Sequence, residues 1–124
     1  MSLKEYFENI KGLGVIATAG ADGRVDAAVY ARPHIMEDGL LAFVMRDRTT
    51  RANIQDNPRA TFLFKEEGPG YNGKRLYLTK VKEEDDADII ESVRRRNYLS
   101  DRNSDESMFL VYFKVDKERP LVGD

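Results

Sequence analysis

Six short stretches of strand length, separated by turn signals, restrict the fold of this chain more than any other feature. Residues 15–19 are apolar and rich in strand-forming residues, Asp22-Gly23 is a hairpin turn signal, and residues 25–30 resume the strand pattern. These two strands are therefore predicted to pair in an antiparallel arrangement. Glu37-Asp38-Gly39 marks a second turn before residues 40–45, a nearly continuous apolar run that forms the third strand.

The second half of the chain continues this strand pattern. Residues 60–64 form the fourth predicted strand, residues 75–81 alternate polar and apolar side chains as the fifth, and residues 109–115 form the sixth. Strands joined mostly by hairpins favour a closed antiparallel barrel, since closure removes the edge strands that otherwise invite aggregation. The chain is therefore predicted to be mainly β, with a β-sandwich as the alternative to the barrel.

The first few residues predict a short helix before the strands begin. Ser2, with Glu5 three residues later, forms the pattern of a capping box, and apolar residues follow at helical spacing. Gly12 and Gly14 are predicted to end this helix, because glycine favours helix termination.

Two further helices are predicted between the strands. Residues 49–56 form a short helix that Asn57-Pro58 ends, because proline cannot continue a helix. Residues 85–99 form another, with acidic residues at its start and Arg94-Arg95-Arg96 toward its end, as the helix dipole prefers. The polar residues 100–107 are predicted to form a mobile loop.

The composition argues against several classes of protein. A chain of 124 residues has the size of one domain, which is predicted to span residues 1–124. It contains no cysteine, so disulfides, thiolate nucleophiles and cysteine-ligated metals are excluded, and a cytoplasmic location is expected. The first residues lack an apolar core of signal-peptide length and no run of about 18 apolar residues occurs, so we expect a soluble protein without a membrane partner. The net charge of −2 gives no overall attraction to nucleic acid, and no nucleic-acid partner is expected.

A three-glycine motif occurs at Gly68-Pro69-Gly70-Tyr71-Asn72-Gly73. In dinucleotide-binding proteins this pattern connects a strand to a helix whose first turn faces the pyrophosphate. Here the motif leads into the predicted strand 75–81 instead. We therefore interpret it as a tight loop between antiparallel strands, in which glycine supplies positive φ angles.

The most informative cluster is Arg46-Asp47-Arg48-Thr49-Thr50-Arg51, at the junction of an apolar strand and a short helix. Backbone N–H groups at the helix start, two hydroxyl groups and up to three guanidinium groups could converge there on a terminal phosphate. The alternative is a solvated turn in which Thr49 or Thr50 only caps the helix.

Arg32 and His34 follow the second predicted strand. Arg32 could reach the same anion if its strand lies beside the third strand. His34 is the only histidine, and no carboxylate is placed at a recognised metal-ligand spacing from it, so no metal site is predicted. A surface or interface role is favoured for His34, with general-base catalysis as the alternative.

Five stretches, in order along the chain, carry a resemblance that covers roughly residues 5 to 117. They are Gly14-Val15-Ile16-Ala17-Thr18, Asp22-Gly23, Leu40 to Met45, Asn53-Ile54-Gln55-Asp56-Asn57-Pro58-Arg59-Ala60 and Gly73-Lys74-Arg75-Leu76-Tyr77-Leu78. Together they resemble the pyridoxamine 5′-phosphate oxidase-like, FMN-binding split-barrel family. This resemblance implies a six-stranded antiparallel split barrel with short flanking helices, a homodimer, and two FMN molecules bound in clefts between the subunits.

The resemblance also implies which residues bind the flavin. Basic and hydroxyl side chains hold the phosphate, and residues of the second and third strands lie against the isoalloxazine ring. This sequence has threonine at two positions where family members commonly carry arginine or lysine, and Arg48 and Arg51 could replace that charge. The phosphate positions are Arg32, Arg46, Arg48, Thr49, Thr50 and Arg51, and the ring positions are Tyr30, Ala31, Val44 and Met45.

The function implied by the resemblance is an FMN-dependent oxidoreductase that uses flavin redox chemistry on an unidentified small substrate. Two alternatives stay open, because a fold does not choose among the functions built on it. One is a non-enzymatic FMN carrier or electron-transfer module, since no substrate-binding constellation is visible. The other is a cofactor-free barrel that binds another ligand.

Overall fold

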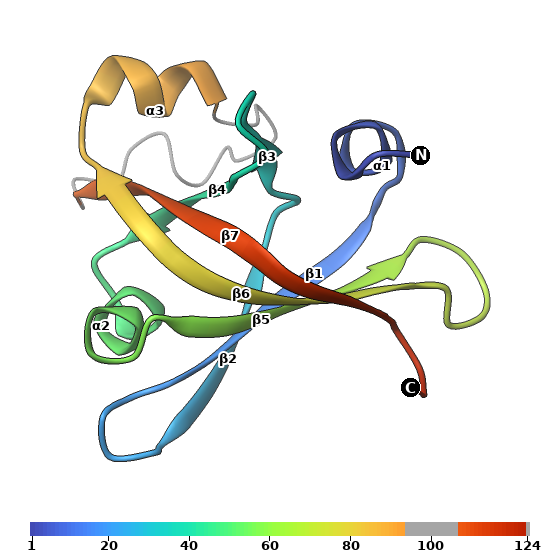
Figure 1. The fold of residues 1–124 in the computed structure, drawn as a ribbon, viewed down its shortest axis with the longest axis horizontal. Helices are drawn as coiled ribbons and strands as arrows, with labels where there is room; N and C mark the ends of the chain where they lie inside the picture. The colour runs from blue at the N-terminus through green and yellow to red at the C-terminus, as the bar shows by residue number, and fades with distance from the viewer. Residues whose placement is uncertain (94–106, 124) are drawn as a thin grey trace.

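The protein is a strongly curled antiparallel sheet that forms a half-barrel, with short helices around it (Figure 1). The computed structural model describes residues 1–93 and 107–123, and within them the strand order is β2-β1-β5-β6-β7-β4-β3. The strands are β1 Gly12–Ala19, β2 Val25–Tyr30, β3 His34–Ile35, β4 Leu41–Arg46, β5 Arg59–Glu66, β6 Gly73–Glu84 and β7 Met108–Pro120. The helices are α1 Leu3–Asn9, α2 Thr49–Asp56 and α3 Ala87–Val93.

The described residues contain seven strands, where the sequence predicted six. The additional strand, β3, is only two residues long, too short to leave a periodic pattern. It pairs with the start of β4, where His34 lies opposite Ala42 and Ile35 opposite Leu41. In the described part of the chain β2 and β3 are the two edges of the sheet, so hydrogen bonds do not close the barrel. The predicted closed barrel is in fact open along one seam.

The predicted pairing of the first two strands is confirmed, because β1 and β2 are antiparallel partners. The interpretation of the three-glycine motif is confirmed as well. It connects the antiparallel strands β5 and β6, and Gly68 and Gly70 have φ angles of 106° and 87°. Such angles suit glycine, which has no Cβ to clash with its own backbone.

The capping box at α1 is confirmed. The Ser2 hydroxyl accepts a hydrogen bond from the Glu5 backbone N–H, and the Glu5 carboxylate accepts one from the Ser2 backbone. The prediction that Gly12 and Gly14 end this helix is wrong, because α1 ends at Asn9 and both glycines lie in β1. A Cβ on Gly14 would lie 2.5 Å from Cζ of Phe62 and 2.7 Å from the carbonyl oxygen of Tyr30. Glycine is therefore required there for close packing and not for helix termination.

The second helix has its predicted bounds, but neither threonine caps it. The N-cap is Arg48, which makes no side-chain capping hydrogen bond. At α3 the acidic start has a direct explanation, because Asp86 Oδ1 accepts hydrogen bonds from the backbone N–H groups of Asp88 and Ile89. The predicted continuation of this helix through Arg94-Arg95-Arg96 to residue 99 lies outside the described residues, as do residues 100–106 of the predicted loop.

Aromatic rings fill the inside of the half-barrel. Phe62 is the centre of this packing, with ring centroids 5.0 Å from Phe43 and 5.9 Å from Phe7. Phe7 belongs to α1, so the same contacts hold that helix against the sheet. Each such ring contributes about 1.5–3 kcal/mol when it is fully buried. The fully buried phenylalanines are Phe7, Phe62, Phe64 and Phe113.

None of the helices in residues 1–93 and 107–123 has the length and apolar character that a membrane span requires.

The close contact at Gly14 leads to a stability prediction. Gly14→Ala should lower the free energy of unfolding by about 1–3 kcal/mol, the usual cost of overpacking, because neither the buried Phe62 ring nor the Tyr30 backbone can move away easily. Urea denaturation followed by circular dichroism measures this change. Gly39→Ala is the contrasting variant: Gly39 has a φ of 87° and open space around it, so any loss there comes from backbone strain, whereas Gly14 has no positive φ and its loss comes from crowding. If Gly14→Ala lowered the free energy of unfolding by only a tenth of the expected amount, the proposed packing role would be contradicted.

Candidate functional site

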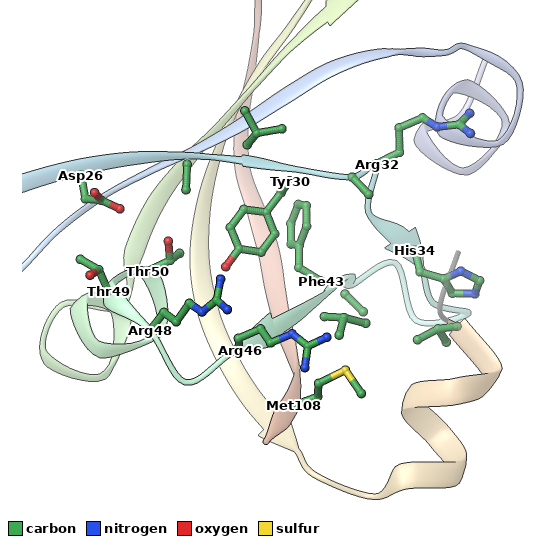
Figure 2. Close-up of a pocket in the computed structure, with 16 residues that line it drawn as sticks. Asp26, Tyr30, Arg32, His34, Phe43, Arg46, Arg48, Thr49, Thr50 and Met108 are labelled. Carbon is green, nitrogen blue, oxygen red and sulfur yellow. The ribbon is translucent and has the colours of Figure 1, made fainter. Parts of the chain in front are cut away.

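A cavity of about 420 Å³ lies at the open seam of the half-barrel, between β2 and β4 (Figure 2). The first turn of α2 borders one end, and Val93 of α3 and Met108 of β7 contribute to its wall. The volume is within the range of about 300–1,000 Å³ that is usual for sites that bind small molecules and cofactors. The seam that leaves the barrel open therefore also creates this concavity.

One end of the cavity is polar and carries most of the charge. β4 ends at Arg46 and α2 begins at Thr49, so this short junction brings Arg46, Arg48, Thr49 and Thr50 to the same wall. Thr50 is buried, with only 4% of its surface exposed. The hydroxyl group of Tyr30 points toward this end from β2 (Figure 2). Guanidinium and hydroxyl groups together form a set of hydrogen-bond donors suited to an anion.

The pKa of Tyr30 reflects the groups around its hydroxyl. Burial is the largest effect and raises the pKa of the Tyr30 hydroxyl, and the nearby Asp26 carboxylate raises it further. A hydrogen bond with Thr50 and the positive charge of Arg48 lower it. The pKa is raised overall, so the phenol stays protonated at neutral pH and keeps its O–H as a donor. The Tyr30 ring packs edge-on against Phe43, with a centroid distance of 6.1 Å, which holds the hydroxyl in place.

The rest of the cavity is mainly apolar. Phe43 and Val44 contribute from β4, Ala28 and Ala31 from β2 and the segment after it, and Met108 from β7. His34 lies at the end away from the threonines, beside α3 (Figure 2). It is exposed, in agreement with its predicted surface position. A flat ligand with an anionic group at one end matches this distribution of apolar and polar walls.

Eight of the ten residues that the sequence assigned to a flavin line this cavity, and their role in binding stays a prediction. The eight are Tyr30, Ala31, Arg32, Val44, Arg46, Arg48, Thr49 and Thr50. Met45 does not line it, because its side chain is fully buried in the main core cluster of the sheet.

Arg32 contributes to the cavity wall, but its guanidinium group points toward α1 (Figure 2). Its Nη1 donates hydrogen bonds to the carbonyl oxygens of Phe7 and Ile10, at 2.9 and 3.1 Å. The sequence placed Arg32 near the anion on the condition that the second and third predicted strands are neighbours. β2 and β4 face each other across the seam without pairing, but the guanidinium group of Arg32 is turned away from it. Arg32 instead satisfies carbonyl groups at the end of α1.

Arg51 also lies outside the cavity lining and is held by other parts of the fold. Its guanidinium group bonds to Glu83 of β6 at 2.5 Å and to Asp47 at 3.0 Å, and it lies 3.6 Å from the ring centroid of Phe109 in β7. Burial tends to raise the pKa of Glu83, but hydrogen bonds from Arg51 and Lys80 outweigh burial, so the pKa is lowered. Arg51 thus joins α2 to the sheet as an ion pair.

The sequence prediction missed Asp26 and Ala28, although a signal for them existed. Both lie on β2 at alternate positions before Tyr30, and alternate residues of a strand face the same side. It also missed Phe43 and Met108, whose place in the cavity depends on the pairing of β4 with β7.

The fold and the cavity together define the class of this protein, an antiparallel split barrel with a concave site at its seam. Solved structures share this fold. An FMN-binding protein from Syntrophomonas wolfei is 16% identical, with a TM-score of 0.77 over 99% of this chain and 86% of that chain. A candidate pyridoxamine 5′-phosphate oxidase from Listeria innocua is 19% identical, with a TM-score of 0.66 over 94% of this chain and 93% of that chain.

A third similar structure is an F420 reductase, which is 15% identical, with a TM-score of 0.63 over 93% of this chain and 94% of that chain. By sequence, no protein-family description and no curated protein matches the chain. At such identities the structural likeness establishes the fold, and the predicted split barrel is confirmed.

The contacts of Arg51 predict a structural role that can be measured. Arg51→Met should lower the free energy of unfolding by about 2 kcal/mol, because it removes charge-assisted hydrogen bonds and leaves Glu83 partly buried without its main partner. The measurement is urea denaturation. Arg59→Met, at an exposed arginine of β5, is the control and should change stability by less than about 0.5 kcal/mol. Equal effects of the two substitutions would contradict this role.

Proposed function

We propose that the chain binds FMN in the cavity between β2 and β4 and acts as an oxidoreductase on a small substrate. The observation that carries this proposal is the set of guanidinium and hydroxyl donors at one end of an otherwise mainly apolar cavity. A flavin mononucleotide has the matching division, with a phosphate at one end and a flat ring system at the other.

The residues present fit this cofactor chemically. Arg46 and Arg48 supply positive charge, and Thr49, Thr50 and Tyr30 supply hydroxyl groups for a phosphate. The sequence analysis assigned Tyr30 to the flavin ring, whereas this proposal assigns its hydroxyl to the phosphate. The reason is that the hydroxyl faces the polar end and the ring lies against Phe43. Met45 and Arg51 are not included, since neither lines the cavity.

The apolar walls would hold the flavin ring. Val44 lines the cavity on β4, and Ala28 and Ala31 line it on the β2 side, where small side chains leave room for a flat ligand. Bound FMN would supply one-electron and two-electron redox chemistry, while the protein would supply binding, orientation and electrostatics. The similar structures support this proposal, since one is an FMN-binding protein and another a candidate oxidase.

We also propose that the protein is a homodimer, as the resemblance implies. The outward face of β2-β1-β5 carries apolar residues in register, with Val15 opposite Val29 on one side and opposite Leu63 on the other. Val29 is 69% exposed and Leu63 is 38% exposed. Val29 also lines the cavity, so a second chain on this face would lie beside the cavity mouth. A surface of this kind is typical of an interface.

The binding proposal is tested by a visible absorption spectrum of the purified protein and by titration with FMN and riboflavin. Flavin bands or saturable FMN binding are expected. Arg48→Ala should weaken FMN binding by about 1.5–3 kcal/mol, or roughly tenfold or more, and riboflavin binding much less, because riboflavin lacks the phosphate. Arg59→Ala removes an exposed arginine outside the cavity and should leave both affinities unchanged.

A wild-type protein that binds neither flavin would contradict the proposal, and equal losses for FMN and riboflavin in Arg48→Ala would contradict the phosphate assignment. Turnover of NADH or NADPH by the loaded protein separates an oxidoreductase from a flavin carrier, because a carrier binds the cofactor without turnover.

The dimer is tested by size-exclusion chromatography with light scattering. Leu63→Asp places a charge on the apolar outward face and should shift the protein from two chains to one, because a buried unpaired carboxylate is costly. Val81→Asp, at a half-exposed valine of β6, is the control and should stay a dimer. A monomeric wild type, or a fully dimeric Leu63→Asp protein, would contradict the proposed interface.

A further inference from the structure

We propose that the Asp26 carboxylate limits how much negative charge a ligand can carry at the polar end of the cavity, because it repels a doubly charged terminal phosphate. This inference rests on the proposed FMN site. Asp26 is then a specificity-determining residue. The arginines favour FMN over riboflavin because they attract the phosphate, and Asp26 reduces that preference because it repels the phosphate.

The position of Asp26 carries the inference. Asp26 and Tyr30 are four residues apart on β2 and both line the cavity, so both face the same side of the strand. Figure 2 shows Asp26 at the end of the cavity where Thr49 and Thr50 begin α2. Arg48 lines this end too. A phosphate held by these donors would therefore have a carboxylate as a neighbour.

The fold holds Asp26 in this place through its partner strand. Asp26 pairs with Thr18 of β1, which is buried with 4% of its surface exposed. The hydroxyl of Thr18 accepts a hydrogen bond of 3.0 Å from Asn53 Nδ2 of α2. This hydrogen bond ties the strand beside Asp26 to the helix that carries Thr49 and Thr50.

The charges at this end decide what Asp26 does to a ligand. A phosphate monoester carries about −1.5 to −2 charges at neutral pH. Arg46 and Arg48 attract this charge, whereas Asp26 repels it, and the effect of Asp26 on the pKa of Tyr30 indicates that its field reaches the polar end. Riboflavin has no phosphate, so the same carboxylate should hardly affect its binding.

The test measures FMN and riboflavin affinities of Asp26→Asn and Asp26→Ala by flavin fluorescence at one fixed salt concentration. Both variants should bind FMN about fivefold more tightly, the upper range for a partly exposed charge interaction, and riboflavin with little change. Two variants are used because the asparagine amide could itself donate to a phosphate, whereas alanine cannot. Circular dichroism and thermal unfolding check that both variants keep the fold.

Glu67→Gln is the matched control, because it removes one negative charge from an exposed loop beyond β5, outside the cavity lining. Its FMN affinity should equal that of the wild type. Weaker FMN binding in both Asp26 variants would overturn the inference and show that Asp26 orients Arg48. Unchanged binding, tightening only in Asp26→Asn, or an equal gain for riboflavin would overturn it as well. A wild-type protein that binds neither flavin overturns the proposed function, and the inference with it.

Discussion

The half-barrel is left open along one seam, and the position of the cavity follows from that opening. In the described part of the chain β2 and β4 do not pair, so side chains and not backbone hydrogen bonds connect them. The edge-on contact of Tyr30 with Phe43 crosses this seam. Because Phe43 also packs on Phe62, the wall of the cavity continues into the aromatic core. One wall of the cavity is therefore supported by close-packed aromatic side chains.

The arginines near the start of α2 show how one local sequence can serve two purposes. Arg46 and Arg48 line the cavity, whereas Arg51, one turn further along the helix, is bonded to Glu83 and packed on Phe109. The second arrangement fixes α2 against the sheet. The proposed phosphate site would therefore depend on Arg51 indirectly, through the position of the helix that carries its hydroxyl groups.

Much of the fold was predictable, because strands, turns and caps leave local patterns. The hairpin of β1 and β2, the bounds of α2 and the capping box at Ser2 all follow from residues close together in the chain. The errors have a common origin. Gly14 was interpreted as a helix stop because its real partner, Phe62, is far away in sequence. Only part of the candidate site could be predicted, for the same reason: the direction in which a long side chain points depends on partners that are distant in the chain.

The order of strands and turns, and the concentration of arginine and threonine at one strand-to-helix junction, could be recognised from the amino-acid sequence alone. These features depend on interactions within a few residues, and alternation along a strand or capping of a helix can be recognised without a partner. The direction of Arg51 came only from the tertiary fold, because its guanidinium group is held by Glu83 of β6 and lies on Phe109 of β7. Alternation along β2 places Asp26 and Tyr30 on one face, but only the packing of residues distant in the chain brings that face opposite β4 across the seam.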